Sequence, residues 1–269
     1  ITDLRMGQEP AYTFNFDLGP LATVGSVPAR HMSQRPDVGA ALSQLWTRLK
    51  GAPVTDNPAV VMSRVGPAWI AVTETPTLTA FDPDTLATIG PLPIQDDAHI
   101  HLMAAHGSTD DDGNYWNVGT QLGPKCEVKL FRLRPRATRR EVVASLRMPK
   151  AGYTHAFAMT ARHAIVWETA MRAQPLSFRF SAKSYIRNFR WEPDAGSRLH
   201  AISLADGSVR SWDAPPMMCF HAVQAWEEGE AFVAELHERW MRRQPALPPC
   251  GDTARAAPQR FLPPAREMP

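Results

Sequence analysis

The stretch DDGNYWNVGTQLGPKCEVKLFRL, residues 111–133, carries the pattern that decides the fold class. Residues 111–114 form a turn signal, and two short runs rich in β-forming residues follow at 115–118 and 127–133. Short runs of this kind, separated by turn residues, are typical of antiparallel strands. This stretch therefore predicts a β-sheet.

The same alternation of short β-type runs and turn signals extends from about residue 58 to residue 236. It predicts an all-β barrel, sandwich or propeller, although strictly repeated Trp-Asp blade motifs are absent. An apolar stripe with helical spacing predicts one short helix at residues 38–49, which ends before Gly51. Further strands are expected at residues 60–65, 68–73, 164–168, 199–203 and 231–236.

Charge and cysteine content limit the class of protein. The net charge of +2, from 29 Lys and Arg against 27 Asp and Glu, provides no strong basic field for nucleic acid. The arginine-rich segments 132–140 and 239–243 are expected to be solvated loops, with a weak docking patch as the alternative. Cys126, Cys219 and Cys250 form no C-x-x-C pair, which argues against a disulfide scaffold and for a reducing compartment.

Targeting signals and the last segment give two further expectations. No apolar run is long enough to span a bilayer, and no charged-then-apolar leader is found, so a cytoplasmic location is expected. From residue 237 onward the sequence is rich in proline and arginine and has no periodicity. Residues 237–269 are therefore expected to form a disordered tail.

Three histidines lie in recognisable local frames far apart in the sequence. His106 follows two alanines, His155 lies in the run YTHAF, and His221 lies in the run CFHA. A neutral imidazole nitrogen is a good ligand for Fe(II), but a lone histidine is more often an ordinary core residue. The three can form one iron site only if the fold brings their segments to a common axis.

Short segments in the range 30–236 occur in an order that carries a family resemblance. They are GAPVTDN (51–57), TET (73–75), FDPDTL (81–86), AH (105–106), DGNYWNVG (112–119), YTHAFAMT (153–160), WEP (191–193), RLH (198–200) and FHAVQAWEE (220–228). Each segment alone is weak. Together, and in this order, they resemble the carotenoid cleavage oxygenase family, especially its β-carotene oxygenases and the retinoid isomerohydrolase of the retinal pigment epithelium.

The resemblance implies a seven-bladed β-propeller that holds Fe(II) on its axis with four histidines, some of them oriented by glutamates. On the matching motifs, His106, His155 and His221 would be three of the ligands, and Glu74 would be an orienting carboxylate that accepts an imidazole N–H. The implied reaction is O2-dependent cleavage of a conjugated double bond in a carotenoid or apocarotenoid, a lipophilic polyene, to aldehyde or ketone products. Some members of the family cleave stilbenes, and one isomerises a retinyl ester.

The chain also departs from the family pattern. Counterparts of the family's N-terminal motifs and of its fourth histidine are not found, and Gly107 stands where a proline usually follows the first ligand. Residues 1–236 are therefore expected to be a portion of a propeller, a fragment incomplete at both ends and with impaired activity. One alternative is a non-catalytic propeller fragment that acts as an interaction or lipid-binding module, and another is a stilbene-cleaving dioxygenase.

The other histidines and acidic residues have weaker claims on the site. His99 and His101 are expected to be partly exposed, with both side chains on one face of a strand. The remaining residues of these types are expected to be structural or solvent-facing: His163, His200, His237, Glu168, Glu227 and Glu228.

The segment 176–189 mixes aromatic and apolar residues with cations. The family carries part of a membrane-facing patch at the corresponding place, and apolar side chains flanked by cations suit contact with a membrane surface. An ordinary core strand and loop is the alternative. The residues expected to make a peripheral membrane contact are Leu176, Phe178, Phe180, Tyr185, Ile186 and Phe189.

Overall fold

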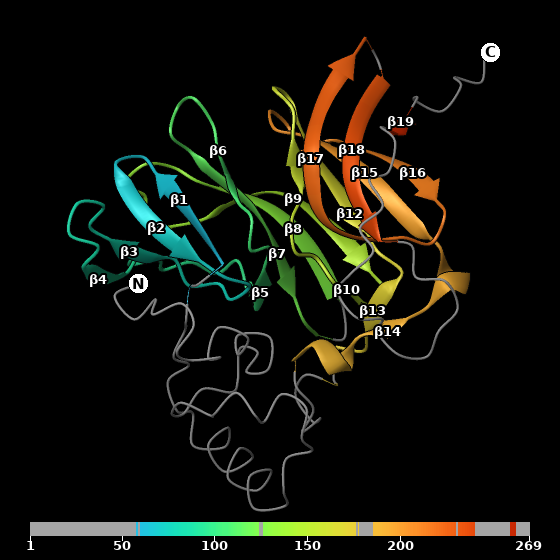
Figure 1. Ribbon diagram of the computed structural model, residues 1–269, viewed down its shortest axis with the longest axis horizontal. Coiled ribbons are helices and arrows are strands. Elements are labelled where there is room, and N and C mark those ends of the chain that lie inside the picture. Colours follow the sequence, from blue (N-terminus) through green and yellow to red (C-terminus); the bar gives the residue numbers. More distant parts are fainter. Residues whose placement is uncertain are drawn as a thin grey trace, which may run out of the picture.

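Antiparallel strands account for nearly all of the regular structure in the described part of the chain, as the computed structural model shows (Figure 1). The structure describes residues 58, 60–123, 126–175, 177, 185–229, 231–239 and 259–261. The strands are β1 (Val61–Val65), β2 (Ala68–Val72), β3 (Thr79–Phe81), β4 (Thr88–Pro91), β5 (Leu102–Met103), β6 (Ser108–Thr109), β7 (Tyr115–Gln121), β8 (Cys126–Leu133), β9 (Glu141–Met148), β10 (Ala151–Gly152), β11 (Ala158–Met159), β12 (His163–Glu168), β13 (Met171–Ala173), β14 (Arg190–Trp191), β15 (Ser197–Ser203), β16 (Val209–Ala214), β17 (Met218–Glu228), β18 (Ala231–Arg239) and β19 (Gln259–Phe261). Two short 3-10 helices, η4 (Tyr185–Asn188) and η5 (Pro193–Ala195), lie between strands.

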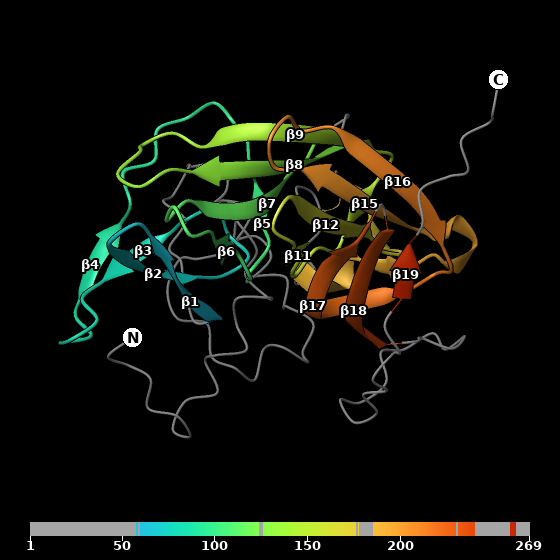
Figure 2. The same ribbon diagram turned by 90° about the horizontal axis from the view of Figure 1, so that it is seen from above.

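The strands form five antiparallel sheets, in which neighbours along the chain are mostly neighbours in the sheet. The first has the order β1-β2-β3-β4, and the second has the order β5-β7-β8-β9, with β6 also paired to β7. The later sheets have the orders β10-β13-β14, β11-β12-β15-β16 and β17-β18-β19. Seen from above, the sheets follow one another along an arc from β1 to β18 (Figure 2). No sheet closes on itself among the described strands, and the predicted all-β fold class is confirmed.

The strands predicted from the sequence are present in the described part of the chain. The predicted runs fall on β1, β2, β7, β8, β12, β15 and β18. The predicted helix at residues 38–49 lies outside the described residues. His99 and His101 are exposed as expected, but neither lies on a strand. His99 has a positive φ of 53°, which interrupts the extended backbone, and β5 begins only at Leu102.

Two expectations about polar segments are wrong in part. The segment from residue 237 was expected to be disordered, yet β18 continues to Arg239 and β19 pairs with β18, so backbone hydrogen bonds order both pieces. Arg140 was expected to be solvated, but its side chain is only 10% exposed. Its Nε donates to a carboxylate oxygen of Asp96 at 2.7 Å, because a buried guanidinium needs a paired anion.

The hydrophobic core lies between successive sheets. Nearly every residue of β7 is buried, so this strand packs on both of its faces. Among the largest fully buried side chains are Tyr115, Phe131, Tyr153 and Trp167. Close packing on both faces leaves these strands little room to shift. The strands therefore fix the positions at which the loops between them begin and end.

Glu227 on β17 joins this strand to the turn between β11 and β12. Its carboxylate accepts hydrogen bonds from Thr160 Oγ1 at 2.6 Å and from Arg162 Nε at 2.8 Å, and it lies 3.1 Å from His163 Nδ1. Burial alone would raise the pKa of Glu227, but the hydrogen bonds outweigh it and lower the pKa to about 2. Such a group stabilises the fold above its unfolded pKa and loses that contribution as the pH falls.

We expect Glu227→Gln to flatten the dependence of the unfolding free energy on pH between about 4.5 and about 2. The variant has no carboxylate whose protonation differs between the folded and unfolded states. Urea unfolding followed at several pH values measures this slope. Glu228→Gln, at the exposed neighbouring residue, is the control for the loss of one charge on β17. A wild-type slope in Glu227→Gln would contradict the expectation.

Candidate metal centre

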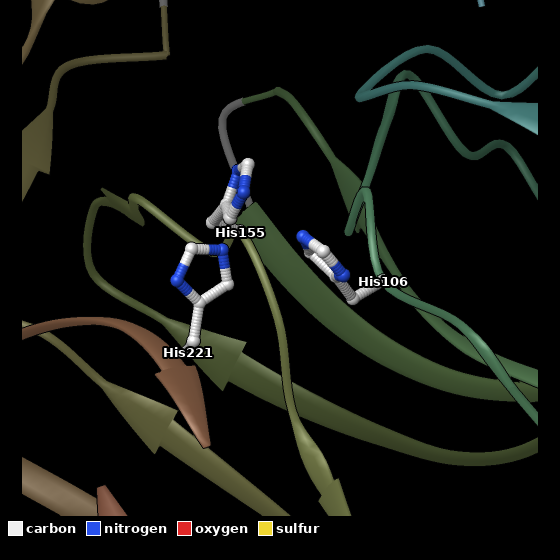
Figure 3. A group of neighbouring side chains, drawn as sticks. All are labelled: His106, His155 and His221. Atoms are coloured by element: carbon white, nitrogen blue, oxygen red, sulfur yellow. The ribbon is translucent and has the colours of Figure 1, made fainter. Parts of the chain in front are cut away.

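The three histidines singled out from the sequence converge in the structure (Figure 3). His106 lies between β5 and β6, His155 lies between β10 and β11, and His221 lies on β17. Each offers one ring nitrogen, and these nitrogens lie within 4.8 Å of one another. The ring centroids are 4.8–5.1 Å apart, and the rings meet edge to face. Three segments from different sheets therefore bring three imidazoles to one point.

The state of His106 suits a metal ligand. Its Nε2 is buried and has no hydrogen-bond partner among the described residues. Burial, together with the neighbouring imidazoles of His155 and His221, lowers the pKa of His106 to about 4. The ring is therefore neutral near pH 7, and a neutral imidazole presents a lone pair. A buried nitrogen without a partner is costly, and a metal ion between the three rings would satisfy it.

Glu74 holds the ring of His155 from outside the cluster. One carboxylate oxygen, Oε1, lies 2.6 Å from His155 Nδ1 and accepts the hydroxyl proton of Tyr153 at 2.7 Å. The side chains of Glu74 and His155 are both less than 10% exposed. A carboxylate at this place favours the tautomer that carries its proton on Nδ1, which leaves the lone pair of Nε2 for a metal. The structure thus places the Glu74 carboxylate beside a ring nitrogen of His155, and its orienting role stays a prediction.

Backbone hydrogen bonds connect the segments that carry these side chains. The carbonyl oxygen of His155 accepts hydrogen bonds from Ala105 N at 2.9 Å and from His106 N at 3.3 Å. The carbonyl oxygen of Glu74 accepts a hydrogen bond from Met103 N at 2.9 Å. The relative positions of His106, His155 and Glu74 are thus fixed by main-chain contacts as well as by side chains.

His221 comes from a strand with a local irregularity. The pairing of β17 with β18 shifts register between Cys219 and His221, and such bulges re-aim side chains. Cys219 is fully buried, its carbonyl oxygen accepts a hydrogen bond from Trp167 Nε1 at 3.2 Å, and its thiol lies 3.2 Å from the carbonyl oxygen of His221. His221 itself is exposed, so the histidine cluster is open to solvent on this side.

Aromatic side chains line one side of the cluster. Tyr153 stacks on His155 with an interplanar angle of 12°, and Phe220 contacts both rings at centroid distances of 5.6 and 5.7 Å. Sequence reasoning gave Tyr153 and Phe220 no role of their own. The spacing was a usable signal, because residues 153 and 155 lie two apart in extended chain and face the same side.

The residues with weaker claims lie elsewhere. His163 lies beside Glu227, and His200 is buried with its Nδ1 2.8 Å from Ser211 Oγ. Glu168 forms a buried ion pair with Arg172 at 3.0 Å. Their structural roles were expected from the sequence.

The expected membrane patch finds no support at its one residue with a described side chain. Phe189 is 6% exposed and packs edge to face on Tyr153, so it belongs to the core that supports the histidines. Burial in the hydrophobic core therefore decides the position of Phe189, although this segment mixes aromatic residues and cations. The side chains of the other five residues of the expected patch lie outside the described part. Among the described residues, no helix has the length and apolar character needed to cross a membrane.

Comparisons with known proteins agree with this fold. The family model described as "Retinal pigment epithelial membrane protein" matches residues 22–259. A curated relative is the carotenoid cleavage dioxygenase 8 homolog A, chloroplastic, of Oryza sativa subsp. japonica, 29% identical over 184 residues. The match covers 66% of this chain and 33% of the relative, so the chain spans about a third of that protein's length.

Solved structures of two proteins share the fold. A mutant of the Synechocystis apocarotenoid oxygenase aligns with a TM-score of 0.57 at 18% identity, over 69% of this chain and 40% of that one. The cobalt-substituted form of the same oxygenase aligns with a TM-score of 0.53. The lignostilbene dioxygenase of Pseudomonas brassicacearum aligns with a TM-score of 0.55 at 18% identity, over 67% of this chain and 38% of that one.

The fold and the converging histidines define a propeller-like β protein with a candidate metal centre. The chain belongs to the retinal pigment epithelial membrane protein family, the carotenoid oxygenase family that its sequence motifs resemble.

Glu74→Gln is expected to weaken metal binding by about 10- to 100-fold without unfolding the protein. The amide is a poorer acceptor for the Nδ1–H of His155 and no longer favours the tautomer that presents Nε2. Calorimetric titration with Co(II) measures the affinity. Glu192→Gln is the matched control, because it removes a carboxylate that binds Lys150 away from the histidines. Equal affinities in the two variants would contradict the expected role of Glu74.

Proposed function

We propose that this chain carries the metal centre of an Fe(II)- and O2-dependent oxygenase that cleaves a conjugated double bond of a carotenoid or apocarotenoid. The observation that carries the proposal is the convergence of three histidine ring nitrogens, which lie within 4.8 Å of one another, with the carboxylate of Glu74 beside His155. Membership in the family supplies the reaction class.

The donor set suits Fe(II). His106, His155 and His221 would hold the metal through neutral nitrogens, and imidazole is a common ligand of iron. The cobalt-substituted Synechocystis apocarotenoid oxygenase supports a divalent metal in a related protein. Bound Fe(II) would supply the activation of O2, chemistry that protein side chains do not provide.

The chain's own residues would orient the metal and shape its surroundings. Glu74 would favour the tautomer of His155 with its proton on Nδ1, and Tyr153 donates a hydrogen bond to the same carboxylate oxygen. Phe220 is partly exposed and presents aromatic surface beside the ligands, which suits a lipophilic polyene, and the buried Tyr153 packs behind it and helps to exclude water from this side. The cleavage requires no general base from the protein.

The finer architecture also remains a proposal. We infer that residues 1–236 contribute successive blades of a seven-bladed propeller and that the segment after residue 236 is largely a tail, apart from its two ordered pieces. The family match to residue 259 and the sequence of antiparallel sheets support the propeller portion. A peripheral membrane contact would have to use parts of the segment 176–189 other than Phe189.

A stilbene is the second candidate substrate. The similarity to the lignostilbene dioxygenase of Pseudomonas brassicacearum favours it, since the two folds align. The metal centre would be the same, and the surface beside the ligands would differ. A third candidate function is a non-catalytic interaction or lipid-binding module. The exposure of His221, which opens one side of the cluster to solvent, is consistent with it.

The test is to load the purified protein with Fe(II) without oxygen, to measure the iron content, and then to add O2 with substrate. β-Carotene, an apocarotenal and a hydroxystilbene are assayed in parallel, with products identified by chromatography and mass spectrometry. Aldehyde formation from a carotenoid or apocarotenal that requires Fe(II) supports the proposal. Cleavage of the stilbene alone favours the second candidate. Stoichiometric iron without any cleavage, or no iron at all, contradicts catalysis by this chain.

A further inference from the structure

The backbone leaves the second sheet at His106. Strands β5 and β6 both pair with β7, but the four residues between them, 104–107, lie opposite only two residues of β7, 117 and 118. This bulge carries His106 out of the sheet, where it forms an isolated parallel bridge with Ala156. The position of the ligand therefore depends on what holds the bulge in shape.

Asn117 occupies the inside of this bulge. Its side chain is fully buried, and its Nδ2 donates to the carbonyl oxygen of Ala104 at 2.9 Å and to the Tyr115 hydroxyl oxygen at 2.7 Å. Its Oδ1 accepts a hydrogen bond from Val118 N at 2.6 Å. Both amide protons and the amide oxygen are thus used, and two of the three bonds satisfy backbone groups next to the place where the ladder is interrupted.

Tyr115 fixes the orientation of the Asn117 amide through a hydrogen bond. The ring is fully buried, and its hydroxyl accepts the second amide proton of Asn117. The same hydroxyl lies directly against Gly107, where an added Cβ would meet it at 2.2 Å. Asn117 and Tyr115 therefore hold the chain on both sides of His106: a hydrogen bond holds Ala104, two residues before it, and the Tyr115 ring lies against Gly107, the residue after it.

We propose that Asn117 is a positioning residue for His106, acting through the carbonyl of Ala104 and supported by the Tyr115 hydroxyl. The significance of this role rests on the proposed metal function, because His106 would be a ligand. Without the amide, the carbonyl of Ala104 loses its partner and the bulge relaxes. His106 then shifts relative to His155 and His221, whose ring centroids lie 5.0 and 4.8 Å away.

The first test needs no metal. The amides of Ala105 and His106 both donate to the carbonyl oxygen of His155. Their hydrogen-exchange rates are compared between the wild type and the Asn117→Ala variant. Asn114→Ala is the matched control, since Asn114 is a buried asparagine of the same hairpin whose Nδ2 donates to Asp110. Asn117→Ala is expected to speed exchange at these two amides by about tenfold or more, and Asn114→Ala is expected to leave them protected.

The second test measures the ligand geometry through Co(II), whose visible spectrum reports its coordination. Asn117→Ala is expected to lower Co(II) affinity by about tenfold or more and to alter the spectrum. Tyr115→Phe, which leaves the ring against Gly107, is expected to weaken binding by about threefold or more. If Asn117→Ala does not fold, Tyr115→Phe decides the question with both measurements.

The outcomes separate this inference from the proposed function. Wild-type protein that binds no Co(II) contradicts the metal centre, while the exchange rates still decide whether Asn117 holds the bulge. Wild-type protection at Ala105 and His106, or an unchanged Co(II) spectrum and affinity in the Asn117→Ala variant, overturns the inference and leaves the metal centre standing. Equal effects of Asn117→Ala and Asn114→Ala also overturn it, because the role would then be general stability.

Discussion

His155→Ala is expected to abolish Fe(II) binding, whereas His163→Ala is expected to leave it nearly unchanged. His155 is central to the cluster, because Glu74 orients its ring and its carbonyl oxygen anchors the segment that carries His106. The alanine variant keeps the backbone anchor and removes only the imidazole. It also leaves the buried Glu74 carboxylate without its imidazole partner, which adds a cost in stability.

Metal analysis after anaerobic loading decides this prediction. His163 is the matched control, since its imidazole also lies beside a glutamate, at 3.1 Å from Glu227, but its ring contacts Phe232 and it is not part of the histidine cluster. His221→Ala is expected to behave as His155→Ala does. Circular dichroism and thermal unfolding show whether a variant is folded when its iron is measured. Equal iron retention in the His155→Ala and His163→Ala variants would refute the metal centre.

The sequence was sufficient to predict that the three histidines lie together, because each of them lies in a short motif that resembles the family. The motifs also predicted an acidic partner at Glu74, and the contact with His155 is present at 2.6 Å. Strands such as β7 and β8 were predictable because turn residues separate short runs of β-forming residues. The ligand roles of His106, His155 and His221 remain predictions until a metal is measured.

Other parts of the site could not be predicted from local patterns. Tyr153 reaches Glu74 across 79 residues of sequence, and this contact depends on how separate sheets pack. Phe189 lies in a segment whose composition suggested a membrane surface, but composition does not determine which face of a segment is buried. Asn117 lies in the motif DGNYWNVG at residues 112–119. Its proposed role, however, follows only from the bulge at residues 104–107, where the pairing of β5 and β6 with β7 is interrupted.

The departure from the family pattern at Gly107 has a structural reason in this chain. Glycine follows His106, and the hydroxyl and ring of Tyr115 occupy the space that a side chain at this position would need. An ideal Cβ would lie 2.2 Å from the hydroxyl oxygen and 2.3 Å from Cζ. Since Tyr115 is fully buried, it cannot move aside into solvent.

Gly107→Ala is therefore expected to destabilise the fold by about 1–3 kcal/mol, as overpacking of a close-packed core does. It is also expected to displace His106, since the two residues are adjacent, and to reduce Co(II) affinity by about tenfold or more. Gly152→Ala is the control, because an added Cβ there meets no atom closer than 3.9 Å. Urea unfolding and Co(II) titration measure the two effects.

A double-mutant cycle tests the cause of this effect. Tyr115→Val removes the hydroxyl and the ring atoms that the new methyl group would meet, so adding Gly107→Ala in that background should cost much less than in wild type. A coupling free energy of about 1 kcal/mol or more is expected for residues in such contact. Additive losses would show that the cost at Gly107 comes from the backbone of the bulge and not from Tyr115. A proline or any other side chain at position 107 would meet the same ring. We therefore expect a larger residue at position 107 to be tolerated only when Tyr115 is replaced by a smaller one.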